Sequence, residues 1–198
     1  MYKRQILPHV FNIRKSRVLD SEKRLKITDP FSVLVSSDLR EHMSLVDLGC
    51  GTGFYAIPAS RIVKDGIVYA LDVQKEMLVT LRRKIRKLRI KNIHVIRSEL
   101  HRLPLKDGSI DLALLMNTLH EVYGKQAILG EVAKVLKPDG NLSVVDWQKS
   151  RGGESFGPPF EERISLHQAQ RILKHRYFRL NRGFRAGPYH YGLLFCKR

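Results

Sequence analysis

Short apolar runs alternate along this chain with longer segments in which apolar residues recur at helical spacing. Buried strands are predicted at 45–48, 67–71, 93–96, 110–116 and 142–147. Helices are predicted at 30–43, 54–63, 74–88, 126–136 and 165–174. Two last strands are predicted at 178–184 and 189–195. Strands that alternate with helices indicate a parallel sheet with helices packed on its faces.

Local signals place several of the boundaries. Asp29-Pro30 predicts a helix start with proline at the first helical position, and Ser165 predicts a helix N-cap. Residues 137–140, Lys-Pro-Asp-Gly, predict a stop and a turn. The inward stripe of the first helix is predicted as Phe31, Leu34, Val35, Leu39 and Met43. That of the helix at 74–88 is predicted as Met77, Leu78, Leu81, Ile85 and Leu88.

The chain has 198 residues, which is enough for one domain with a sizeable core. Residues 1–29 are polar and basic, and we expect a loose arm or a short helix over the mouth of a site. Residues 1–5 fit no predicted element. We expect residues 30–198 to form a single domain, because the sequence shows no internal repeat and no second set of elements.

The stretch Leu-Val-Asp-Leu-Gly-Cys-Gly-Thr-Gly-Phe at 45–54 combines a buried strand, a glycine turn and a helix start. Glycine permits positive φ and lets a ligand approach without a Cβ in the way. The following helix offers free backbone N–H groups, and Asp47 adds a fixed acceptor at the strand end. This combination predicts a nucleotide cradle. The alternative is a tight strand–helix turn that binds no ligand.

Residues 46–53, Val-Asp-Leu-Gly-Cys-Gly-Thr-Gly, resemble the first motif of the class I S-adenosylmethionine-dependent methyltransferases, and within them the small type 11 group. A G-x-G-x-G spacing with an acid two residues earlier favours this family over dinucleotide enzymes, which carry G-x-G-x-x-G. The resemblance implies a Rossmann-like α/β fold: a doubly wound, mostly parallel seven-stranded sheet whose last strand is antiparallel. It also implies S-adenosyl-L-methionine as donor and S-adenosyl-L-homocysteine as product.

Asp72 ends the second predicted strand, about twenty residues after the glycines, where an acid that binds ribose hydroxyls is expected. The alternative is a turn or N-cap acid. In the resembled family, the turn at 98–100 borders the adenine, although it can equally be an ordinary polar turn. The resemblance thus implies a cofactor site formed by Asp47, Gly49, Cys50, Gly51, Gly53, Asp72, Val73, Met77, Ser98, Glu99, Leu100 and Asn117.

Methyl transfer from a sulfonium needs a general base only when the nucleophile must lose a proton. Candidate bases are His120, Glu121, Tyr189 and His190. We select His120, because it follows the fourth strand at the carboxyl edge, where ligands bind in open α/β sheets. The alternative is a structural histidine. No Cys/His set has the spacing of a metal site, so we expect no metal.

The formal net charge of +17 indicates which molecules this protein can attract, and it does not bear on the fold. The cations gather in the N-terminal arm, in 74–89 and in 164–198, which contains no acid. We favour a small-molecule acceptor, and an anionic one would exploit this charge. An RNA acceptor and a cofactor-binding protein without catalysis stay open as alternatives. No Asn/Asp-Pro-Pro-Tyr motif of amino-directed nucleic-acid methyltransferases follows the fourth strand, where Asn117-Thr118-Leu119-His120 stands instead.

Two cysteines, Cys50 and Cys196, predict no disulfide framework and fit a reducing, cytoplasmic setting. No apolar run approaches the length of a membrane span, so no membrane partner is expected. The sequence leaves the oligomeric state, the acceptor and the methylated atom open.

Overall fold

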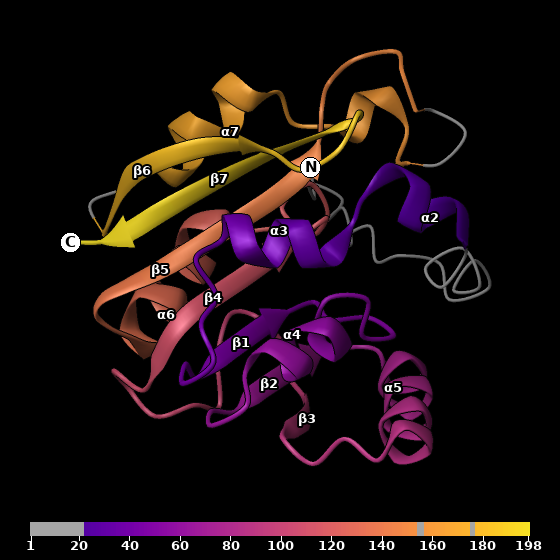
Figure 1. Ribbon diagram of the computed structural model, residues 1–198. Helices are drawn as coiled ribbons and strands as arrows, with labels where there is room; N and C mark the ends of the chain where they lie inside the picture. Colours follow the sequence, from indigo (N-terminus) through magenta and orange to yellow (C-terminus); the bar gives the residue numbers. More distant parts are fainter. Residues whose placement is uncertain (1–21, 154–156, 175–176) are drawn as a thin grey trace, which may run out of the picture.

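The computed structural model describes residues 22–153, 157–174 and 177–198, and in them one seven-stranded sheet carries the fold (Figure 1). The strand order across the sheet is β3-β2-β1-β4-β5-β7-β6. The strands are β1 (Leu45–Leu48), β2 (Val68–Asp72), β3 (Ile93–Arg97), β4 (Ile110–Met116), β5 (Leu136–Trp147), β6 (Phe178–Arg185) and β7 (His190–Lys197).

The first five strands are parallel, and β7 is antiparallel to both of its neighbours, β5 and β6. This confirms the predicted sheet, its antiparallel last strand included. β1 and β4 lie in the middle of the sheet, and β1 is buried along its whole length, Asp47 included.

Helices cover both faces of the sheet (Figure 1). The helices are α2 (Glu22–Ile27), α3 (Pro30–Ser36), α4 (Ala56–Ile62), α5 (Lys75–Leu88), α6 (Lys125–Val135) and α7 (Leu166–Leu173), with a short 3₁₀ helix, η2 (Phe160–Glu162). Residues of α6 and α7 belong to one hydrophobic cluster, and residues of α3, α4 and α5 belong to the other. The domain is therefore a three-layer α/β/α arrangement.

The predicted helix starts at Asp29-Pro30 and Ser165 are confirmed. The Asp29 side chain accepts hydrogen bonds from the backbone N–H groups of Phe31 and Ser32. Ser165 forms a capping box with Gln168 at the start of α7.

The predicted inward stripe of the first helix is wrong in part. Phe31 and Val35 are exposed, and α3 instead buries Pro30, Val33 and Leu34. The helix has only seven residues and ends at Ser36, so a single narrow stripe meets the sheet. On α5, Leu88 is likewise exposed, because the helix ends at the left-handed Arg89 directly after it.

The turn predicted at 137–140 lies inside β5. Ile110 pairs with Leu136 and Leu112 pairs with Asn141, so four residues of β5 bulge out of the ladder opposite one residue of β4. Asp139 takes a positive φ of 62° there. Residues 137–140 do form a turn, but this turn is a bulge within β5 rather than a loop before the strand.

The start of α4 also differs from the prediction. The helix begins at Ala56 rather than Phe54, because the chain after the glycines makes an additional turn. Of the basic arm, residues 22–27 form α2, and the predictions for residues 1–21 lie outside the described residues. Because β1, β2, β4 and β5 are parallel, their carboxyl ends meet at one edge of the sheet, where the candidate site lies.

Candidate active site at the carboxyl edge of the sheet

Two of the three glycines after β1 are required by close packing inside the protein. Gly49, Gly51 and Gly53 all have positive φ, at 76°, 53° and 91°. A Cβ on Gly53 would lie 2.4 Å from a methyl carbon of Leu81 on α5. One on Gly49 would lie 2.8 Å from the Thr118 hydroxyl after β4. The loop is therefore held tightly between α5 and the segment that follows β4.

Asp47 lies beneath this loop with only 1% of its surface exposed. Its carboxylate accepts the backbone N–H of Ala56, the first residue of α4. Its Oδ2 atom is buried and has no hydrogen-bond partner among the described residues. Burial, followed by the nearby charge of Asp72, raises the pKa of Asp47 to about 7. A buried carboxylate oxygen without a partner needs an explanation, and a bound ligand would supply one.

Asp72 joins the end of β2 to the glycine loop. Its Oδ2 accepts the backbone N–H of Gly51 at 2.8 Å, and its Oδ1 accepts that of Gln74 at 2.8 Å. Burial raises its pKa, although hydrogen bonds from Gln74, Gly51 and Val73 act in the opposite direction. A carboxylate has further lone pairs beyond these two bonds, so Asp72 can still accept from hydroxyl groups.

The remaining residues predicted to bind the cofactor differ in how exposed they are. Ser98 donates its hydroxyl to the carbonyls of Glu99 and Arg102, at 3.0 and 3.1 Å. Glu99 and Val73 are exposed, while Leu100 packs partly against the core and Cys50 is buried in the loop. Met77 is only 2% exposed and lies on the buried face of α5.

Asn117 directly follows β4 and has an unusual backbone conformation. Its φ is 55°, in a region that non-glycine residues seldom occupy. Its N–H donates to the carbonyl of Val145 at 2.7 Å, which fixes this conformation against β5. Its side-chain Oδ1 is buried and has no partner within the described part of the chain. Strained residues with orphaned polar atoms are typical of functional sites.

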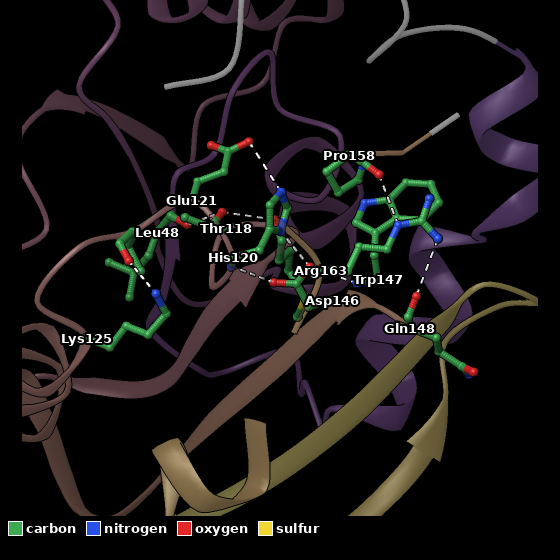
Figure 2. Close-up of polar contacts among 12 residues, drawn as sticks. Leu48, Thr118, His120, Glu121, Lys125, Asp146, Trp147, Gln148, Pro158 and Arg163 are labelled. Carbon is green, nitrogen blue, oxygen red and sulfur yellow. Dashed lines mark hydrogen bonds and ion pairs between the residues drawn. The ribbon is translucent and has the colours of Figure 1, made fainter. Parts of the chain in front are cut away.

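His120, three residues further on, is held by Asp146 at the end of β5 (Figure 2). His120 Nδ1 lies 2.7 Å from Asp146 Oδ1, and the backbone N–H of His120 donates to Asp146 Oδ2 at 3.0 Å. Trp147 N–H also donates to Asp146 Oδ1 at 2.7 Å. Asp146 is fully buried, so the imidazole ring has one fixed orientation.

The surroundings of His120 favour its protonated form. Burial opposes a charge on the ring, but the carboxylates of Asp146, Glu121 and Glu162 outweigh burial and raise its pKa. Glu121 Oε1 lies 3.7 Å from His120 Nε2, on the side of the ring away from Asp146 (Figure 2). Burial raises the pKa of Glu121 to about 7, partly offset by His120.

The candidate base His190 has a different environment. It is 1% exposed, its Nδ1 lies 3.1 Å from the Thr28 hydroxyl, and its ring stacks 4.1 Å from Trp147. Burial lowers its pKa to about 4, so the ring is neutral and held in the core. Tyr189, next to it, is half-buried and forms no part of the His120 pair. The geometry thus distinguishes His120, with its neighbour Glu121, from His190 and Tyr189.

Sequence reasoning missed two residues of this edge. Asp146 is the next-to-last residue of β5, as Asp47 is of β1, and Asp72 ends β2. This repeated acid near a strand end was an available signal. Arg163 is 1% exposed and donates from Nε to the carbonyl of Pro158 at 3.0 Å. Its Nη1 donates to the carbonyls of Gln148, Ser150 and Gly152, and its guanidinium lies 5.4 Å from the Trp147 ring (Figure 2).

The sequence matches the family described as "Methyltransferase domain" over residues 39–177, and the chain belongs to this family. A solved S-adenosylmethionine-dependent methyltransferase from Aquifex aeolicus is 36% identical and superposes with a TM-score of 0.89, covering 94% of this chain and 99% of that one. A putative type 11 methyltransferase from Sulfolobus solfataricus is 25% identical with a TM-score of 0.70, covering 87% and 94%. The protein is an S-adenosylmethionine-dependent methyltransferase of class I, as predicted.

Curated relatives match over a shorter stretch. The ubiquinone/menaquinone biosynthesis C-methyltransferase UbiE of Haemophilus ducreyi is 33% identical over 115 residues, which are 57% of this chain and 44% of the relative. The demethylmenaquinone methyltransferase of Bacillus mycoides is 29% identical over 106 residues, 53% of this chain and 45% of the relative. This chain thus covers less than half the length of these relatives.

Among the described residues, no three His, Cys, Asp or Glu side chains lie close enough together to hold a metal ion. The described helices include none that is long and apolar enough to cross a bilayer.

Proposed function

We propose that this methyltransferase acts on a small molecule whose nucleophile gives up a proton to His120. The observation that carries the proposal is the 2.7 Å contact between His120 Nδ1 and the fully buried Asp146. Asp146 fixes the ring and stabilises its protonated form, so Nε2 is the atom that accepts a proton. This is the arrangement of a general base oriented by a carboxylate.

The residues around the glycine loop fit the donor. In the proposed site, Asp72 binds the ribose hydroxyls, and Asp47 and Asn117 border the methionine part. Each of these two has one buried oxygen without a hydrogen-bond partner among the described residues. The glycine loop lies between them, and Ser98, Glu99 and Leu100 border the adenine. When bound, S-adenosylmethionine supplies an activated methyl group on a sulfonium, so the protein mainly has to align the nucleophile and exclude water.

The charges at the carboxyl edge favour a neutral acceptor over an anionic one. The carboxylates of Asp146, Glu121, Glu162 and Asp72 lie near His120 or near one another. They repel an anion and attract the cationic donor. The relatives named for ubiquinone and menaquinone biosynthesis supply a candidate class, the ring carbon of a reduced quinone, whose reaction at carbon also ends with loss of a proton.

A turnover assay on an acceptor panel tests the proposal. The panel contains reduced short-chain quinones, phenols, amines, carboxylates and RNA, and the product S-adenosylhomocysteine is quantified by mass spectrometry. We expect turnover with a neutral acceptor, and a loss of about 10²–10⁴-fold in His120→Gln with donor binding retained. His167→Gln, which changes an exposed histidine on α7, is the matched control and should keep full turnover. Equal turnover of His120→Gln and His167→Gln would contradict the role of His120.

A further inference from the structure

The second ring nitrogen of His120 faces another acceptor. Asp146 accepts at Nδ1, and an ionised carboxylate only accepts, so Nδ1 carries the proton of the neutral ring. Nε2 then has a lone pair, and Glu121 Oε1 lies 3.7 Å from it. A lone pair and a carboxylate oxygen at this distance repel each other unless a proton or a donor group lies between them.

The exposure of the side chains around the ring indicates by which of them a proton can reach solvent. The His120 side chain is 4% exposed and Asp146 is not exposed at all, so neither can pass a proton to water directly. The Glu121 side chain is 24% exposed. Of these three side chains, only Glu121 contacts both the ring and the solvent.

We propose that Glu121 takes from His120 the proton that the acceptor loses, and passes it to solvent. The N–H bond at Nε2 breaks, an O–H bond forms on the Glu121 carboxylate, and the ring returns to its neutral form. This relay rests on the proposed function and narrows the class of acceptor. A site with such a relay is built for acceptors that lose a proton, which are N–H, O–H or acidic C–H nucleophiles. Tertiary amines and thioethers need no base and gain nothing from it.

The electrostatic surroundings agree with a proton that passes between the two side chains. Burial raises the pKa of Glu121 to about 7, and the negative neighbours of His120 raise the pKa of the ring. The two side chains lie close enough for the charge of one to affect the protonation of the other, so their titrations depend on each other. Among the described residues, Asp146 and Glu162 act on both members of the pair, Asp72 acts on Glu121, and His190 interacts with His120. Lys125 interacts with Asp146.

Nitrogen NMR of the full chain saturated with S-adenosylhomocysteine tests the proposal without an acceptor. The ring nitrogens of His120 are assigned by their loss in His120→Gln and followed against pH in the wild type, Glu121→Gln and Glu121→Asp. Glu41→Gln, which removes an exposed carboxylate elsewhere, is the control of equal charge. We expect Glu121→Gln to lower the titration midpoint of His120 by roughly one pH unit or more, because an opposite charge within a few ångströms is lost.

The same spectra report how fast the Nε2 proton exchanges with water. We expect this exchange to slow several-fold in Glu121→Gln, to recover in part in Glu121→Asp and to stay unchanged in Glu41→Gln. An unchanged midpoint or an unchanged exchange rate in Glu121→Gln overturns the relay. Failure of the acceptor panel would overturn the proposed function instead, and would leave the His120 spectra unaffected.

Discussion

Three carboxylates near the ends of strands lie at the candidate site and differ in their hydrogen-bond partners. Asp47, Asp72 and Asp146 come from β1, β2 and β5, and all three are buried. Asp72 holds the glycine loop, and Asp146 holds His120. Asp47 has one oxygen without a partner among the described residues. Three residues of similar chemistry thus have three different tasks, because their hydrogen-bond partners differ.

Asp72→Ala tests the donor site. We expect S-adenosylmethionine binding to weaken by about 1.5–3 kcal/mol, the scale of lost hydrogen bonds to a charged group. Isothermal titration calorimetry measures the change, and a thermal melt verifies that the domain still folds. Asp107→Ala, in an exposed turn, is the control and should bind the donor as the wild type does. Donor binding by Asp72→Ala at wild-type strength would place the ribose elsewhere.

Asp47→Asn tests the buried charge through the pH dependence of stability. The folded pKa of Asp47, about 7, lies above its ordinary value of 3.8, so the native state holds the proton more tightly. Its contribution to the free energy of unfolding is therefore present below about pH 4 and is lost as the pH rises through 7.

Urea denaturation of the ligand-free protein between pH 4 and 7 measures this effect. The wild type should lose stability relative to Asp47→Asn by up to about 1.4 kcal/mol per pH unit in this window. Glu121 titrates in the same direction and His190 in the opposite one, and the difference between the two proteins cancels both. Parallel stability curves would show that Asp47 is not protonated in the folded state.

At the scale of elements, β5 and the segment after it complete the site. β5 contributes Asp146 and Trp147 at its carboxyl end, and the chain then returns over that end through 148–153 and 157–163. Arg163 binds three carbonyls of this segment from its Nη1 atom and one from its Nε atom. A single buried cation therefore fixes the wall of the site next to Trp147.

Arg163→Met removes this cation and keeps most of the side-chain volume. We expect the free energy of unfolding to fall by about 1–3 kcal/mol, because carbonyls that Arg163 satisfied lose their donor. Urea denaturation measures the loss, and hydrogen exchange should show faster opening of residues 148–153 than in the wild type. Arg179→Met on β6 changes an exposed arginine and should leave both measurements unchanged. Wild-type exchange in 148–153 would show that other contacts hold the segment.

Apolar periodicity predicted the strands and most helices well, because each buried run has to match the period of its element. It failed where tertiary packing decides. The short α3 turns Val35 outward, and the turn residues at 137–140 became a bulge opposite β4. The pairing of His120 with Asp146 joins residues from two strand ends, and no spacing along the chain encodes that contact.

At the scale of the whole molecule, the charge is separated between interior and surface. The net charge is +17, yet carboxylates gather at the carboxyl edge of the sheet. The exposed cations include Arg82, Arg83, Arg86 and Arg89 on and after α5, and none of these four forms an ion pair with a described residue. The surface therefore attracts anions, while the proposed site repels them.

Neutralising Arg82, Arg83, Arg86 and Arg89 together tests whether this surface takes part in the function. We expect donor binding and turnover to stay nearly unchanged, because each exposed charge contributes little on its own. The control changes four exposed arginines elsewhere, Arg40, Arg61, Arg171 and Arg179. RNA binding of all three proteins is then measured across a salt series, and we expect weak binding of similar strength for both variants.

An RNA acceptor predicts a different result in that series. Wild-type binding would be tight and steeply salt-dependent, and the slope of log K against log salt would fall by nearly one unit for each lost phosphate contact. Only the α5 variant would show this fall, because the control keeps the cations of α5. Such a result would contradict the small-molecule acceptor and would assign the basic face of α5 to RNA. Equal salt slopes in both variants would instead show that the cations of α5 face solvent and bind no RNA. The residues at the carboxyl edge of the sheet would then select the acceptor.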